Sequence, residues 1–251
     1  MNLKAAASLF FAVTIMAIGL IGLAGANFAP IGPPVPKTLP GRELLANLCN
    51  LVLLLCGAGL LMRRTAAPAA LALFAWLVIW TVAFKFPFIV RAPLEEVSYQ
   101  SNGENAVLIA AAWVLYGGFA NGTNFLASDR GQRFAHLLYG LALIAFGLSH
   151  FFYLEMTAPL VPRWLPGPIF WAYLTGCIYL ATGISLVTAI GARFGAMVAA
   201  VQITLITVLV WGPMILGGPM SAMHSLETIV SWALTAGAWV LASGWRREKA
   251  V

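Results

Sequence analysis

The sequence predicts an all-α, polytopic membrane protein with about eight transmembrane helices, arranged as two parallel four-helix repeats. Of the 251 residues, 61% are hydrophobic and only 9% are charged, whereas a soluble domain carries about 25% charged residues. The apolar residues gather in runs long enough to cross a hydrocarbon core of about 30 Å. An internal repeat completes the prediction, because VPKTLPG at Val35–Gly41 returns as VPRWLPG at Val161–Gly167, with 161 − 35 = 126.

The apolar runs predict the positions of the helices. We expect them at residues 5–27, 44–62, 68–90, 104–121, 134–153, 168–190, 194–215 and 225–244. The first run also resembles a cleaved signal peptide, with a lysine before it and small residues near Ala24–Ala26. It is longer than the usual apolar region of about 7–15 residues. Its removal would leave the first repeat one helix short, so we expect it to be retained.

The repeat extends through most of the chain. The residue pairs that match at the same offset are Gly57/Gly183, Leu60/Leu186, Pro87/Pro213 and Pro93/Pro219. We therefore expect a first membrane unit at 1–121, a cytoplasmic linker at 122–133 and a second unit at 134–251. Because each unit has an even number of helices, the two units enter the membrane from the same side, which makes the repeat parallel. Pro87 and Pro213 predict a break late in the third helix of each unit.

The loop charges predict the orientation of the chain. The loops on one side carry Lys4, Arg63, Arg64, Arg130, Arg133, Arg193, Arg246, Arg247 and Lys249 against Asp129 and Glu248, which gives 9 − 2 = +7. The other side carries Lys37, Arg42, Lys85, Arg91 and Arg163 against Glu43, Glu95, Glu96, Glu104, Glu155 and Glu227, which gives 5 − 6 = −1. Basic residues concentrate in cytoplasmic loops. We expect a multi-pass protein of a bacterial inner membrane with both termini in the cytoplasm, and no nucleic-acid partner.

The second unit resembles the DoxX-like integral membrane proteins, which are small four-helix units. The resemblance covers residues 134–244 and rests on Gly147, His150, Phe151, Val161–Pro168, Thr175, Gly176, Gly183 and Pro213. The first unit matches only through the repeat. The resemblance implies a four-helix fold, and some members of the family take part in quinone-linked sulfur oxidation or redox complexes. The family's acidic position three residues after Ser/Thr-Gly is Tyr179 here, so no catalytic residue is carried over.

Redox motifs are sparse in this sequence. Cys49, Cys56 and Cys177 form no Cys-x-x-Cys pair, so we expect them to pack as small apolar residues. His136 and His150 are 14 residues apart on one predicted helix. They therefore lie about 21 Å apart and cannot share one haem iron. The sequence favours a role without enzymatic activity.

Lys85 is a candidate intramembrane charge. It stands in the apolar segment VAFKFPF, two residues before Pro87. A cation inside the membrane is a functional candidate by default, and Glu95, Glu96 and Glu104 are its possible partners. The alternative is that the long side chain snorkels to the outer interface.

A second candidate polar site combines His150, Glu155, His224 and Glu227. His150 ends the fifth predicted helix, Glu155 follows in the loop, and His224 and Glu227 begin the eighth. All four lie on one side of the membrane, and the first and last helices of a closed four-helix bundle are neighbours. Two imidazoles and two carboxylates can bind a divalent metal such as zinc, or a polar headgroup. The alternative is that these side chains only cap helix ends beside water.

These patterns leave three function classes open. The first is an accessory, scaffold, or lipid- or quinone-binding component of a cell-envelope complex, with the bilayer and other membrane subunits as partners. The second is a membrane subunit of a quinone-linked oxidoreductase. The third is a small-solute transporter, because parallel repeats also occur in transporters.

Overall fold

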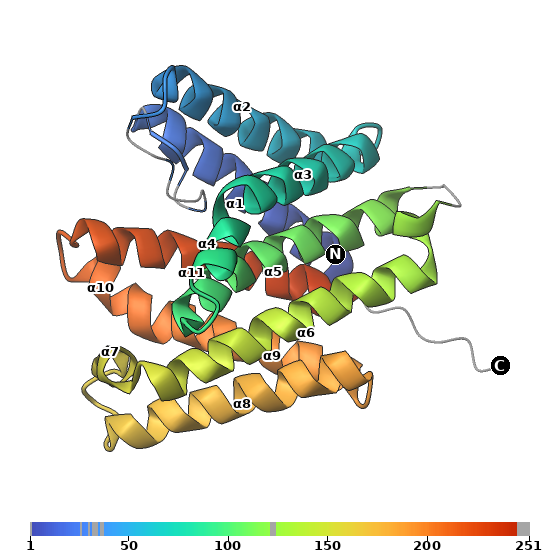
Figure 1. The fold of residues 1–251 in the computed structure, drawn as a ribbon. Coiled ribbons are helices and arrows are strands. Elements are labelled where there is room, and N and C mark those ends of the chain that lie inside the picture. Colours follow the sequence, from blue (N-terminus) through green and yellow to red (C-terminus); the bar gives the residue numbers. More distant parts are fainter. Residues whose placement is uncertain are drawn as a thin grey trace.

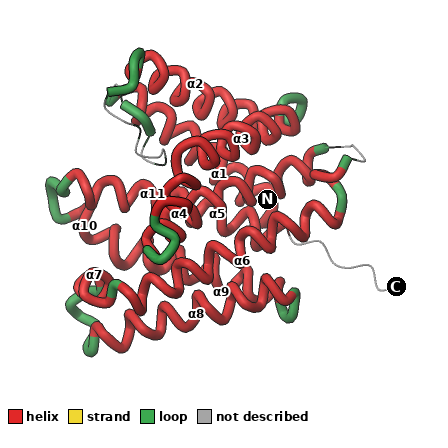
Figure 2. Tube along the Cα trace, viewed as in Figure 1, coloured by secondary structure: helices red, strands yellow, loops and turns green. Residues whose placement is uncertain are grey.

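The chain folds into a bundle of helices joined by turns and loops (Figures 1 and 2). The computed structural model describes residues 2–25, 27–29, 31, 35, 38–120 and 124–244, and no strand occurs among them. Seven helical spans in these residues are long and apolar enough to cross a membrane. The protein is therefore a multi-pass helical membrane protein, as the composition predicts.

The helices alternate in direction along the chain. The first half contains α1 (Leu3–Ala24), α2 (Arg42–Leu60), α3 (Ala66–Trp80), α4 (Phe86–Arg91) and α5 (Glu96–Phe119). The second half contains α6 (Asp129–Phe152), α7 (Leu154–Thr157), α8 (Pro168–Thr188), α9 (Ala192–Ile206), α10 (Gly212–Leu216) and α11 (Ala222–Gly244). Two single 3₁₀ turns lie at Phe125–Ala127 and Ala158–Leu160.

Two predicted boundaries are wrong by more than a few residues. Helix α5 begins at Glu96 instead of residue 104, and α6 begins at Asp129, inside the predicted linker 122–133. The first turns of α5 read EVSYQSNGEN, too polar for a lipid-facing helix, yet Ser98 and Asn105 are buried by protein. Other parts of the protein, and not lipid, cover these residues, so hydropathy does not detect this part of the helix. Residues 122 and 123 of the predicted linker and residues 245–251 of the predicted second unit lie outside the described residues.

Two segments of the bundle wind with π geometry. They are Thr81–Lys85 after α3 and Thr207–Trp211 after α9. Pro87 and Pro213 follow them closely. Because proline has no N–H and its ring crowds the preceding turn, the α-helical hydrogen-bond pattern cannot continue through it. The N–H of Phe86 bonds the carbonyl of Thr81, five residues back, and α4 departs from the direction of α3 (Figure 1). The break that the sequence predicts near each proline is thus a π-helical segment just before it.

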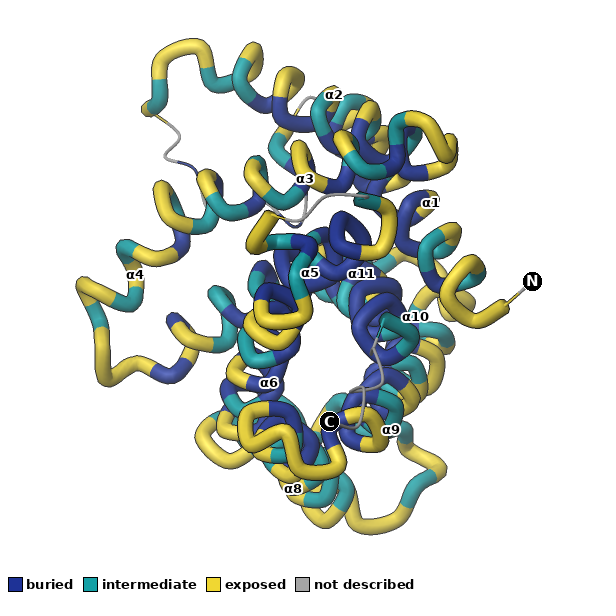
Figure 3. The backbone as a smooth tube through the Cα atoms, turned by 90° about the vertical axis from the view of Figure 1, so that its right-hand side faces the viewer, coloured by how far each residue is buried: buried dark blue, intermediate teal, exposed yellow. Residues whose placement is uncertain are grey.

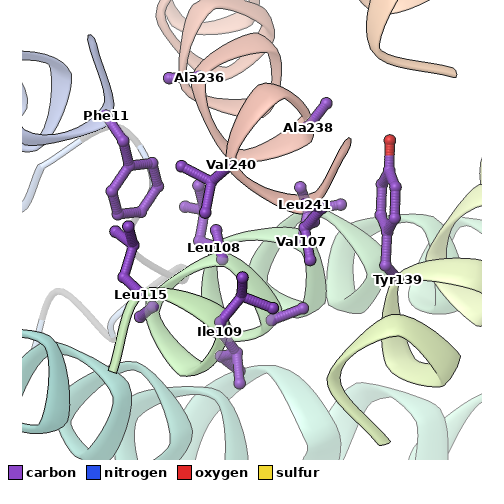
Figure 4. Close-up of a cluster of buried hydrophobic side chains, with 14 of the residues drawn as sticks. Phe11, Val107, Leu108, Ile109, Leu115, Tyr139, Ala236, Ala238, Val240 and Leu241 are labelled. Atoms are coloured by element: carbon purple, nitrogen blue, oxygen red, sulfur yellow. The ribbon is translucent and has the colours of Figure 1, made fainter. Parts of the chain in front are cut away.

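Helices α5 and α11 form the centre of the bundle, and each buries a long series of residues there (Figure 3). They run parallel, because a β-carbon on Gly237 would touch Val107 and Ala111, and one on Gly244 would touch Val114. Helix α1 packs against α2 and α11, whereas α6 packs against α5 and α8. Figure 4 shows the apolar core that these helices share, with Phe11, Val107, Leu108, Ile109, Leu115, Tyr139, Ala236, Ala238, Val240 and Leu241.

Glycines allow the outer helices to approach closely. A β-carbon on Gly57 of α2 would meet the backbone of α1 at Ala12, and one on Gly183 of α8 would meet the backbone of α6 at Gly140. Small residues at such contacts are typical of membrane helices, where close backbone approach replaces the hydrophobic effect as the source of packing energy. The tight α1–α2 and α6–α8 pairs flank the central α5 and α11.

Candidate functional site

Lys85 is the centre of a buried charge cluster. Its ammonium nitrogen lies 3.2 Å from Oε2 of Glu104 and donates a 2.9 Å hydrogen bond to the carbonyl of Ser101. The side chains of Lys85 and Glu104 are only 5% and 22% exposed. Lys85 therefore pairs across helices with Glu104, one of its predicted partners.

The backbone around Lys85 is held by two asparagines of α5. The amide of Asn102 donates to the carbonyl of Lys85 at 3.0 Å. The amide of Asn105 donates to the hydroxyl of Thr81 at 2.9 Å. A π turn leaves carbonyl groups without their usual helical partner, and the Asn102 amide satisfies one of them from the neighbouring helix, whereas the Asn105 amide bonds a side chain of the turn. The position of the lysine is therefore fixed by both its side chain and its backbone.

Glu227 of α11 is the next carboxylate near this pair. It lies close enough for the charges of Glu104 and Lys85 to act on it, but it makes no salt bridge or hydrogen bond to another described residue. One lysine faces two carboxylates, so the fully ionised cluster carries 1 − 2 = −1. An ammonium also has three N–H donors, and the described residues accept from only two of them. The cluster thus offers one ammonium donor and one carboxylate to a further group.

The other predicted partners of Lys85 lie elsewhere. Glu96 is buried and accepts a 2.8 Å hydrogen bond from the hydroxyl of Ser149 on α6. Its second carboxylate oxygen is buried without a hydrogen-bond partner. Glu95 is exposed at the start of α5. Of the three predicted partners, only Glu104, about two helical turns further along α5 than Glu96, reaches the lysine.

The structure gives His150, Glu155, His224 and Glu227 separate surroundings. The His150 ring packs on Tyr179 at 5.6 Å, and its Nδ1 lies 2.8 Å from the carbonyl of Phe146. The ring of His224 packs on Trp211 at 6.2 Å. Glu155 is exposed on α7, and Glu227 belongs to the Lys85 cluster.

The metal version of that prediction is therefore wrong for the described part of the chain. Within it, no three His, Cys, Asp or Glu side chains come together as metal ligands do. The reason is the order of the helices, since the end of α6 that holds His150 lies against α5 and α8. Ser149 bonds Glu96 of α5, and Gly147 faces Gly176 of α8. The first and last helices of the second half, α6 and α11, meet only near the other end of α6, at His136 and Leu241.

Several polar contacts escape sequence reasoning. His136 is buried and bridges α6 and α11, with Nδ1 at 2.8 Å from the carbonyl of Gln132 and Nε2 at 3.1 Å from the carbonyl of Leu241. Asn50 accepts from the N–H of Ala29 and donates to the carbonyl of Asn27. The signal for both was a polar residue within an apolar run, but only the fold supplies the partners. Cys49 and Cys56 are buried as expected, whereas Cys177 is exposed on α8.

The chain was also compared with known proteins. No family model, no curated protein and no solved structure matches it.

Proposed function

We propose that the chain is a DoxX-like membrane protein built from two parallel four-helix repeats, with eight spanning helices that include α5. The two π segments support this arrangement, because their starts differ by 207 − 81 = 126. Each is bonded to the following central helix at equivalent positions, Thr81 to Asn105 and Thr207 to Ser231. The left-handed glycines that precede α2 and α8, Gly41 and Gly167, obey the same offset.

The crossing of the central helices supports a parallel relation. Gly237 faces Ala111, and 237 − 111 = 126. A two-fold axis that relates the repeats must pass between equivalent residues, and parallel α5 and α11 place this axis along the membrane normal. We infer that the axis lies between these two small residues.

The first helix follows a slightly different register. Gly19 faces the backbone of Asn50 and Leu54, whereas Gly147 faces Gly176 and Leu180. The partners differ by 126, and the glycines themselves by 147 − 19 = 128. Gly147 therefore corresponds to Gly19. The similarity of Ile21-Gly22-Leu23 to Phe146-Gly147-Leu148 in the sequence, at an offset of 147 − 22 = 125, would pair it with Gly22 instead.

In each unit a polar side chain of one helix packs against a glycine of the neighbouring helix. The polar residue and the glycine exchange helices between the two units. Gly22 packs on the side chain of Asn50 in the first unit, and Gly176 packs on His150 in the second. The counterparts at offsets 128 and 126 are Gly22 with His150 and Asn50 with Gly176. One polar side chain thus fills the same place in both units, but it comes from the other helix of the pair.

The described charges support the orientation with the termini in the cytoplasm. The end that holds the start of α1 carries Lys4, Arg63, Arg64, Arg130, Arg133 and Arg193 against Asp129, or 6 − 1 = +5. The opposite end carries Arg42, Lys85, Arg91 and Arg163 against Glu43, Glu95, Glu96, Glu104, Glu155 and Glu227, or 4 − 6 = −2. Lys37, Arg246, Arg247, Glu248 and Lys249 lie outside the described residues.

We infer that the protein works as an accessory component that binds the polar head of a membrane-borne quinone or quinol at the Lys85–Glu104–Glu227 cluster. This function rests on two groups of the cluster that make no hydrogen bond to a described residue. They are one N–H of the Lys85 ammonium and the Glu227 carboxylate. A quinone carbonyl accepts a hydrogen bond from the ammonium, and a quinol hydroxyl donates one to the carboxylate. Buried ionisable groups are energetically costly in a membrane protein, so their presence indicates a functional site.

The test is quinone retention on purification. Wild-type protein is isolated from membranes in mild detergent, and extracted quinones are quantified by mass spectrometry per mole of protein. Glu227→Gln leaves the Lys85–Glu104 pair intact and is expected to lower retention about tenfold, which corresponds to one charge-assisted hydrogen bond of about 1.5 kcal/mol. Glu155→Gln removes an exposed carboxylate at the same end and should retain quinone as the wild type does. Equal retention in both variants, or none in the wild type, would refute this function.

A further inference from the structure

A basic pocket lies at the opposite end of the bundle from Lys85. Helices α6, α8 and α9 surround a cavity of about 910 Å³. Arg130 and Arg133 come from the first turns of α6, and Arg193 comes from the first turn of α9. Asp129 shares the first turn of α6, so these four residues together carry 3 − 1 = +2.

The remainder of the pocket is largely apolar. Its walls include Phe134, Leu137, Leu186, Val187, Phe194 and Met197. Phe194 is 75% exposed and Phe134 is 44% exposed, so two aromatic rings stand open at the surface that lipid contacts in the membrane. The pocket therefore combines a positively charged rim with a wall suited to hydrocarbon.

The turn between α8 and α9 also shapes the rim. Ala189 and Gly191 both adopt left-handed backbone conformations, with φ of 61° and 62°. For an alanine this conformation is strained, and a 2.6 Å hydrogen bond from the hydroxyl of Ser185 to the carbonyl of Ile190 helps to hold the turn. No side chain caps α9, so its first N–H groups add to the positive potential that Arg193 creates.

We propose that this pocket binds one anionic phospholipid from the leaflet at the basic end of the bundle. The phosphodiester lies among the three guanidinium groups, which bind phosphate oxygens through paired N–H donors. The acyl chains lie along Phe134, Val187 and Phe194. A free phosphate would use the arginines alone and leave the apolar wall uncovered, and the ammonium of a zwitterionic head group would meet like charge. Basic pockets between helices at the cytoplasmic side are known to suit anionic head groups.

The site is independent of the quinone proposal, because the two lie at opposite ends of the bundle. It also has a built-in control. Arg63 and Arg64 lie in the turn between α2 and α3 at the same basic end, and both are exposed. They do not line the pocket. Removal of these two charges changes the surface potential of this end without touching the proposed site.

The experiment is native mass spectrometry of the full-length protein in detergent, titrated with phosphatidylglycerol, with phosphatidylcholine or with inorganic phosphate. We expect one phosphatidylglycerol to bind tightly per chain. The Arg130→Gln/Arg193→Gln double variant should bind it about 30-fold more weakly, which corresponds to about 2 kcal/mol. The Arg63→Gln/Arg64→Gln control should bind it with wild-type affinity.

A second variant tests the apolar wall separately. Val187→Trp keeps every arginine and fills the cavity from α8 at an exposed position, and we expect it also to lose the bound lipid while it stays monodisperse. Equal weakening in the Arg63/Arg64 control would overturn the proposal, because it would indicate general surface attraction. Equal affinity for phosphatidylcholine, or displacement of the lipid by an equal concentration of inorganic phosphate, would overturn it as well.

Discussion

Replacement of the Lys85–Glu104 pair by apolar residues is expected to preserve stability, although either single replacement is costly. The nitrogen and oxygen lie 3.2 Å apart. At an effective dielectric constant of about 20, this separation gives a Coulombic attraction of about 5 kcal/mol. Most of that attraction offsets the cost of removing both charges from water, so the net value of the pair is small. A variant without either charge loses the attraction and the cost together.

The single variants differ from each other because of Glu227. Lys85→Met leaves two carboxylates together without a cation, so it should lower the free energy of unfolding by about 3–5 kcal/mol, as for a broken buried pair. Glu104→Leu leaves Lys85 beside Glu227, which interacts with it electrostatically, and its cost should therefore be smaller. The Lys85→Met/Glu104→Leu double variant should lie within about 1 kcal/mol of the wild type.

The assay is unfolding of the purified protein by SDS in mixed micelles, followed by the fluorescence of its nine tryptophans. Arg91→Met serves as the control, because Arg91 is an exposed cation six residues after Lys85. It should change the free energy of unfolding by less than about 0.5 kcal/mol. If the costs of the two single variants simply add in the double variant, the groups are not coupled and the reasoning fails.

Three further outcomes are expected. Gly22→Ala should lower stability by about 1–3 kcal/mol through overpacking, because its β-carbon would overlap the side chain of Asn50. Thermal unfolding should show that Asn50→Ala in the same chain restores part of the loss, and no restoration would contradict the contact. Reporter fusions after Arg64 should report the cytoplasm and fusions after Thr157 the outside, and an inverted pattern would refute the orientation. An apolar maleimide that enters the detergent layer should label one thiol per native chain, at Cys177, which no other helix covers, and three after unfolding; labelling of all three at once would contradict the packing.

The sequence predicts most of the helices well because hydropathy and lipid contact usually coincide. The prediction for residues 168–190 compares with Pro168–Thr188 in the structure, and that for 194–215 lies within the span Ala192–Leu216. The start of α5 is different, because its polar turns are covered by protein. Hydropathy reports which residues can face lipid, and a helix surrounded by other helices does not have to satisfy that condition.

The candidate site could be predicted only in part. Lys85 is conspicuous in an apolar segment, and Glu104 is among its possible partners on charge alone. The involvement of Glu227 depends on which helices lie beside α11, and the sequence does not specify that. The same uncertainty led to the wrong metal site, since the position of His150 was inferred from a single closed bundle. Residues far apart in sequence meet through helix order, which local patterns do not encode.

The central place of α5 and α11 has a consequence for biosynthesis. Helix α11 (Ala222–Gly244) follows the other described helices in the chain, so it leaves the ribosome after them. Until it arrives, α1 lacks one of its two main neighbours and α5 lacks its parallel partner. Helix α5 begins with polar turns and is not among the spans apolar enough to enter a membrane unaided, so it depends on its neighbours for insertion. Assembly of this centre should therefore wait for α11, and a chain that stops before residue 222 should be degraded by membrane proteases.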